Sequence, residues 1–100
     1  MATSQTFRAL DYYEAHESPV ASAEALADAV VPAVARGESV RITFEGLRGI
    51  SSSYFNALLI RLRAAASGLE VRRRVTFVTD SNAQKEILDR SINAVLGLAA

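Results

Sequence analysis

The stretch Val40–Leu62, VRITFEGLRGISSSYFNALLIRL, decides the fold of this 100-residue chain. Its first residues alternate, so that Val40, Ile42 and Phe44 fall on one side at a period of two. Their β-branched and aromatic side chains favour a buried strand. We therefore expect an inner strand over Ser39–Glu45.

A glycine-flanked turn and a helix follow this strand. Gly46 and Gly49 allow the positive φ angles of a tight turn. Ser51 is placed to cap a helix over Ser52–Ser67, because its hydroxyl oxygen can accept from backbone N–H groups two and three residues on. Gly68 is expected to end that helix. Hydroxyl groups therefore gather at the positive end of a helix beyond a strand, where α/β proteins commonly build sites.

Upstream, residues 1–6 are expected to form a loose tail and Thr6–Tyr13 a first strand. His16–Ser22 reads as a loop with room for a short strand around Val20. Ser22 is expected to cap a helix over Ala23–Ala35.

Inside that helix, Pro32 predicts a kink or an early end, with Gly37 closing the segment. Downstream, Arg73–Thr79 predicts a third strand, and Asp80 or Ser81 is expected to cap a last helix.

The order strand, helix, strand, helix, strand, helix predicts an α/β fold, because parallel neighbours need crossover connections. We expect a single domain over residues 1–100 with a small, mixed or partly parallel sheet and helices packed on it. The central helix has two faces. Its inward stripe is Phe55, Leu58, Leu59, Leu62 and Ala66. A second face of small residues, one ring and one guanidinium suits close approach by a partner: Tyr54, Ala57, Arg61 and Ala64.

Composition excludes several classes of protein. Half of the residues are hydrophobic, which suffices for a packed core, and there is no cysteine for disulfides or thiolate metal sites. No apolar run approaches a membrane span and no secretory signal is visible, so we expect a cytoplasmic domain. Residues 1–38 carry two basic and six acidic side chains, and residues 39–100 carry nine and five. The zero net charge does not predict nucleic acid as a partner.

The central stretch resembles the STAS domain, and most closely a bacterial group of STAS-like domains of unknown function. That group shows a strand ending in Asp-Phe-Glu-Gly, followed by Ile-Ser-Ser-Ser-Phe or a similar sequence. The matching residues here are Thr43–Gly46 and Ile50–Tyr54, with Thr43 in place of the usual Asp. The resemblance covers about residues 20–97 and implies a STAS-like fold.

In the anti-sigma factor antagonists of this family, an Asp-Ser-Ser-Gly sequence opens the same helix, and a partner kinase phosphorylates its first serine. By position, Ser52 matches that serine, while Ser51 replaces the Asp and Tyr54 the Gly. The resemblance implies a regulatory protein-interaction module whose partner is a histidine-kinase-like ATPase or a serine kinase, with Ser52 as the candidate phosphoacceptor. The candidate partner-binding residues are Arg48, Ser51, Ser52, Ser53, Tyr54, Ala57 and Arg61.

Simpler interpretations stay open beside this one. The serines can serve only as a helix cap. Tyr54 and Arg61 can cover a neighbouring helix or loop of the same chain. The whole domain can instead assemble with itself as a scaffold, or sense a small anion or nucleotide at the helix start.

The remaining polar residues predict no catalysis. His16 has no partner at metal-ligand spacing, Asp80 follows a strand as expected for a helix cap, and Glu45 lies at a strand end. The run Arg72–Arg74 would alternate between the two faces of a strand and so would not form one basic surface. No Ser–His–Asp set or phosphate-binding glycine loop can be assembled. We expect neither enzyme activity nor a cofactor.

Overall fold

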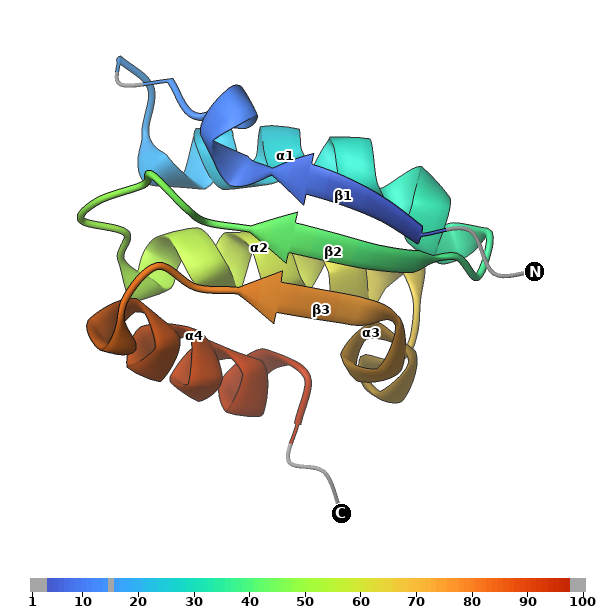
Figure 1. Cartoon of the computed structure of the whole chain (residues 1–100). Helices are drawn as coiled ribbons and strands as arrows, with labels where there is room; N and C mark the ends of the chain where they lie inside the picture. The colour runs from blue at the N-terminus through green and yellow to red at the C-terminus, as the bar shows by residue number, and fades with distance from the viewer. Residues whose placement is uncertain (1–3, 15, 98–100) are drawn as a thin grey trace.

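Three parallel strands form one sheet, shown in Figure 1. The computed structural model describes residues 4–14 and 16–97. Strand β1 (Ser4–Arg8) pairs with β2 (Ser39–Thr43), and β2 pairs with β3 (Val75–Val78), in both cases parallel. The expected α/β class is confirmed, and the sheet is wholly parallel over these strands rather than mixed.

The register brings apolar side chains into rows on one face of the sheet. Ile42 lies between Phe7 and Phe77 on the neighbouring strands, and Val40 lies beside Val75. Val40 and Ile42 are buried, as the period-two pattern predicted.

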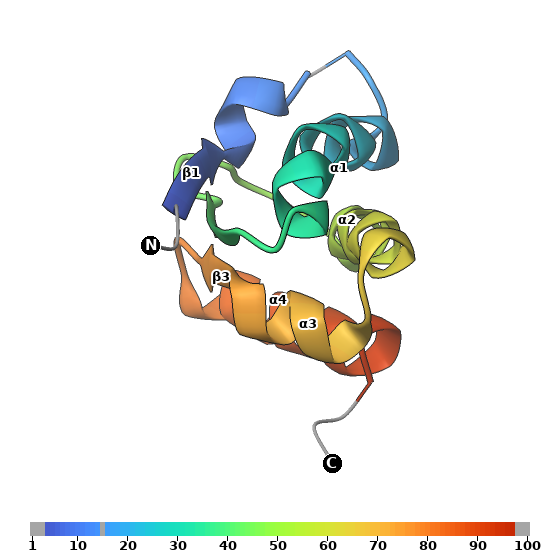
Figure 2. The same ribbon diagram turned by 90° about the vertical axis from the view of Figure 1, so that its right-hand side faces the viewer.

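Two long helices cover that face, as Figure 2 shows: α1 (Pro19–Ala35) and α2 (Ser52–Ala65). A short α3 (Gly68–Arg74) precedes β3, and α4 (Asn82–Val95) follows it and packs on α2. A 3-10 turn, η1 (Ala9–Tyr12), follows β1. Because the spatial order is β1–β2–β3, both crossover connections step across the sheet in the same direction. Right-handed crossovers then place α1 and α2 on the same face.

The first strand begins and ends earlier than its sequence pattern suggested. Residues 4–6 belong to β1 and not to a loose tail, while residues 1–3 lie outside the described residues. The chain then leaves the sheet after Arg8 and enters η1, so the predicted strand over Thr6–Tyr13 is wrong in its second half. The alternation fits only as far as the buried Ala9, since the next side chain, Leu10, is exposed.

Helix α1 begins four residues before its predicted start. Ser18 is the N-cap, its hydroxyl accepts from the Ala21 backbone N–H at 3.1 Å, and Pro19 occupies the first turn. The loop prediction is therefore wrong over residues 19–22, and no strand forms around Val20. Ser22 is not the cap: it is buried in the helix and accepts from the Glu14 backbone N–H.

Pro32 does not end α1, which continues to Ala35. The residue lies close to the helix C-terminus and its side chain is exposed, so its ring displaces no core side chain. The buried Val30 and Val34 on either side of it keep the helix on the core. Gly37, at φ 81°, then closes the segment as predicted.

The connection between α2 and β3 contains a helix that the sequence pattern missed. Helix α2 ends at Ala65, and Ser67 caps α3 by accepting from the Glu70 backbone N–H at 3.1 Å. Gly68 therefore begins a helix rather than ending one. A Cβ at this position would collide with the backbone carbonyl of Leu96, which explains the glycine.

We expect Gly68→Ala to lower the free energy of unfolding by about 1–3 kcal/mol, because α3 and the end of α4 must separate to admit the methyl group. Helix propensity alone would give the opposite sign, since Ala is favoured over Gly inside a helix. Urea denaturation at constant m-value measures the change. The exposed neighbour Leu69 supplies the control, since Leu69→Ala should change stability by less than about 0.5 kcal/mol. A stabilised Gly68→Ala protein would contradict the close approach.

Candidate functional site

The loop between β2 and α2 lies at the carboxyl end of the sheet. Its two glycines have the positive φ angles expected from the sequence. Gly46 and Gly49 have φ angles of 88° and 67°. The Leu47 backbone N–H donates to the carbonyl of Phe44 at 3.1 Å, which closes the turn after the strand. Arg48 lies between the two glycines and is exposed.

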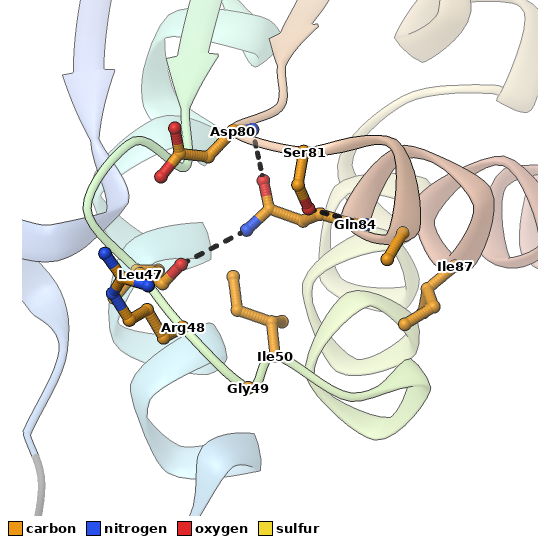
Figure 3. Close-up of a pocket in the computed structure, with 9 residues that line it drawn as sticks. Leu47, Arg48, Gly49, Ile50, Asp80, Ser81, Gln84 and Ile87 are labelled. Carbon is orange, nitrogen blue, oxygen red and sulfur yellow. Dashed lines mark hydrogen bonds between the residues drawn. The ribbon is translucent and has the colours of Figure 1, made fainter.

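This loop is fastened to the turn between β3 and α4. The Gly46 backbone N–H donates to Oδ2 of Asp80 at 3.1 Å. The Gln84 side chain makes two further bonds: Oε1 accepts from the Asp80 backbone N–H at 2.7 Å, and Nε2 donates to the Leu47 carbonyl at 3.4 Å (Figure 3). Gln84 is buried, so these bonds satisfy an amide that would otherwise be costly to bury. Asp80 and Gln84 thus hold the loop in a fixed position.

Gln84 is not among the candidate site residues expected from the sequence. Ser81 is the N-cap of α4 and accepts from the Gln84 backbone N–H at 3.1 Å, as one of the two predicted caps. The spacing of Ser81 and Gln84 is that of a capping box, which signals the helix start. The bond from Gln84 to the Leu47 carbonyl joins residues far apart in the sequence, so local spacing could not predict it.

A pocket of about 470 Å³ opens between this loop and the first turns of α4. Figure 3 shows Ile50 and Ile87 on its walls, with Arg48 and Asp80 bringing opposite charges. Because α1 and α2 cover the same face, this pocket is not the crevice that forms where successive crossovers go to opposite faces of a sheet. It is made instead by a loop fastened to a helix start.

The three serines lie beside this pocket in sequence and are exposed to solvent. Ser51 occupies the predicted N-cap position, with extended backbone angles, but its side chain makes no capping hydrogen bond. Its backbone carbonyl accepts from the N–H groups of Tyr54 and Phe55. The position of the cap is confirmed, whereas the capping interaction that would explain the Ser51 hydroxyl is absent.

Part of the second face of α2 is not free: Tyr54 lies in the core and Arg61 reaches α1, so the expected exposed partner face is wrong at these positions. The Tyr54 side chain is 1% exposed, and Ala57 is half-buried against the core. Arg61 is exposed but reaches α1, where its guanidinium pairs with Asp28 at 2.9 Å and with Glu24 at 3.2 Å. For Arg61, the close neighbour is therefore a helix of the same chain.

Burial leaves the Tyr54 hydroxyl without a hydrogen-bond partner among the described residues. The ring packs edge-on against Phe44 and Phe55, with centroids 6.3 Å and 5.7 Å apart. Burial, with a smaller contribution from Tyr13, raises the pKa of Tyr54 to about 12. The hydroxyl is therefore neutral at physiological pH and carries an unrecovered desolvation cost.

The arginines of α3 form no common basic surface, although the reason differs from the predicted one. Arg74 pairs with Glu70 at 2.6 Å and donates to the Gly37 carbonyl, and Arg73 also approaches Glu70. Arg72 donates to the Gly97 carbonyl at 3.3 Å. These guanidinium groups therefore have acceptors within the chain.

Within residues 4–14 and 16–97, no group of three or more His, Asp or Glu side chains is placed to hold a metal ion. His16 and Glu45 are both exposed. No helix in this part of the chain is long and apolar enough to cross a membrane.

Comparison of the chain with protein-family models, with curated proteins and with solved structures found no match. The resemblance to STAS-like domains therefore stays a prediction from the residues of the central stretch.

We expect Tyr54→Phe to raise the free energy of unfolding by about 1 kcal/mol, because it removes a buried hydroxyl that lacks a partner. Tyr54→Ala should lower it by about 3–5 kcal/mol, since it empties a core position. Urea denaturation of both variants tests this pair. Ser91 on α4 has a second buried hydroxyl without a partner among the described residues, so Ser91→Ala should leave the free energy of unfolding unchanged or higher.

Ionisation of the Tyr54 phenol makes the stability of the folded chain depend on pH. Because its pKa is about 12 in the folded chain and about 10 when unfolded, stability is full below pH 10 and is lost as pH rises towards 12. Tyr54→Phe should weaken this loss. A Tyr54→Phe protein less stable than the wild type at neutral pH would show instead that a buried water satisfies the hydroxyl.

Proposed function

We propose that this chain is a non-enzymatic, cytoplasmic regulatory module that binds a protein partner through the loop Glu45–Ser53. The observation that carries the proposal is the exposure of the three serines at the start of α2, where Ser51 makes no capping bond. The fold makes little use of these hydroxyls, although they occupy the end of a helix that lies in the core. A surface role explains them better than a structural one.

Phosphorylation of Ser52 is the proposed switch. Ser52 is the first residue of α2, so a phosphate there would lie at the positive end of the helix and near backbone N–H groups of the first turn. It would add nearly two negative charges at an exposed position without displacing a core side chain. The exposed Arg48, in the adjoining loop, supplies a cation in the same region. Such a change alters the charge presented to a partner while leaving the fold in place.

The pocket beside the loop supplies an anchor for the partner. Ile50 and Ile87 form apolar walls, and the hydrogen bonds of Gln84 hold the loop before any partner arrives. A preformed pocket lowers the ordering cost of binding. We propose that an apolar side chain of the partner enters it, with Arg48 at the rim.

The class of partner follows from the resemblance to anti-sigma factor antagonists, which implies a histidine-kinase-like ATPase or a serine kinase. The matching positions Ser52 and Ser53 support this class by their exposure. Tyr54 belongs to the core, so we no longer include its ring in the partner surface. Ala57 and Arg61 are likewise engaged with the core and with α1.

The same pocket gives less support to a second function, the sensing of small anions. Its volume is within the range of small-molecule sites. However, the Asp80 carboxylate lines it together with Arg48, so the local charge does not favour an anion.

Affinity purification of the chain from its native host, followed by intact-mass analysis, tests the switch. We expect a phosphorylated form, a co-purifying ATPase or kinase, and loss of the phosphoform in Ser52→Ala. Ser52→Asp should change the affinity for the purified partner about tenfold. Ser53→Ala, at the exposed neighbour, is the matched control for the modification and should keep the phosphoform. A chain that is never phosphorylated, together with an unaltered affinity of Ser52→Asp, would refute the switch.

The anchor has its own test on α4. Ala83 lines the pocket and is exposed, so the side chain of Ala83→Arg should fill the pocket without unfolding the helix. The affinity for the partner should then fall at least about tenfold. Ala94, exposed near the other end of the same helix, provides the control variant Ala94→Arg. Calorimetric titration compares the two. Equal affinities of both variants would exclude the pocket from the interface.

A further inference from the structure

Among the residues that the structure describes, no helix lies on the outer face of the sheet. In Figure 1 the three strands lie in front of α1 and α2, and Figure 2 shows both helices on one side of the strands only. Parallel sheets in globular proteins are usually covered on both faces. The exposed face of this sheet therefore needs its own explanation.

The register arranges the outward side chains of this face in two rows. Thr6, Arg41 and Thr76 form one row across the three strands. Arg8, Thr43 and Val78 form the next. The residues of the first row and Arg8 are exposed, and neither row contains an acidic side chain.

The two arginines on this face are close neighbours. Arg8 lies opposite Thr43, which is two residues beyond Arg41 on β2, so the two arginines form a diagonal pair on neighbouring strands. Neither takes part in the ion pairs of the described residues, unlike Arg36, Arg61 and Arg74. Adjacent like charges give the folded chain no stabilisation.

The flanking threonines are short, so they leave both guanidinium groups accessible and add hydroxyl donors. A guanidinium binds a carboxylate or a phosphate with two parallel hydrogen bonds, which makes this a surface for anionic groups. No aromatic side chain occupies either row, so the stacking platform that single-stranded nucleic acids require is missing from the described face. A second copy docked face to face would bring arginine against arginine.

We propose that the outer face of the sheet, centred on Arg8 and Arg41, is a docking surface for an acidic segment of a partner protein. This surface lies across the strands, whereas the serines and the pocket lie at their carboxyl ends. The two surfaces rest on different residues, so one can fail without the other.

A fluorescein-labelled poly-glutamate peptide tests the proposal, with fluorescence anisotropy of the full chain at low salt. We expect binding that weakens at least about tenfold in the double variant Arg8→Gln/Arg41→Gln and that fades as salt rises. The matched control is Arg63→Gln/Arg90→Gln, which removes the same charge from exposed positions on α2 and α4 and should bind within about twofold of wild type.

Three results would overturn the proposal: no binding of the peptide by the wild-type chain, equal weakening in both double variants, or tighter binding of poly-uridylate RNA than of poly-glutamate. Urea denaturation checks that both double variants fold, and Arg8→Lys/Arg41→Lys provides a second comparison. Since lysine keeps the charge but loses the planar fork, weakening in this variant as well would indicate bidentate recognition.

Discussion

The consecutive strand order β1–β2–β3 is the constraint on which the rest of the structure depends. Because each right-handed crossover advances in the same direction, α1 and α2 must lie side by side on one face. Helix α2 therefore buries two stripes. One includes Phe55, which contacts the Phe44 ring at a centroid distance of 5.0 Å, and the other includes the buried Tyr54. Two residues of what resembled a free partner face in the sequence are therefore engaged within the chain: Tyr54 in the core and Arg61 with α1.

The sequence predicted those parts of the fold that local patterns determine. Period-two alternation identified the buried Val40 and Ile42, and the glycines of the β2–α2 loop were expected to use positive φ. The start of α1 was missed although the Ser18–Pro19 pair is an N-cap followed by a proline in the first turn. Helix α3 was missed because three arginines after a β-branched Val71 resemble the beginning of an exposed strand.

Contacts between distant residues lay beyond local patterns. Gln84 looks like an ordinary capping residue until β3 brings it to the Leu47 carbonyl. Arg61 had the spacing of a partner-binding residue, and only the packing of α2 on α1 places Asp28 within 2.9 Å of it. For the candidate site, the sequence therefore identified the exposed serines, whereas the pocket and the loop-fastening bonds required the three-dimensional arrangement.

The same constraint that buries Tyr54 also determines which surfaces remain available. With α1 and α2 on one face, two parts of the sheet stay free of these helices: the carboxyl edge, where the loop is held by Asp80 and Gln84, and the opposite face, where Arg8 and Arg41 lie. The edge gains rigidity because its polar groups are paired with one another, and rigidity favours selective binding. On the outer face, the side chains around the two arginines are short, so the guanidinium groups are accessible. Accessible charges favour electrostatic association with a partner. A partner that carries an apolar anchor for the edge and an acidic segment for the face would gain from both, since the second contact forms at a high effective concentration once the first is made.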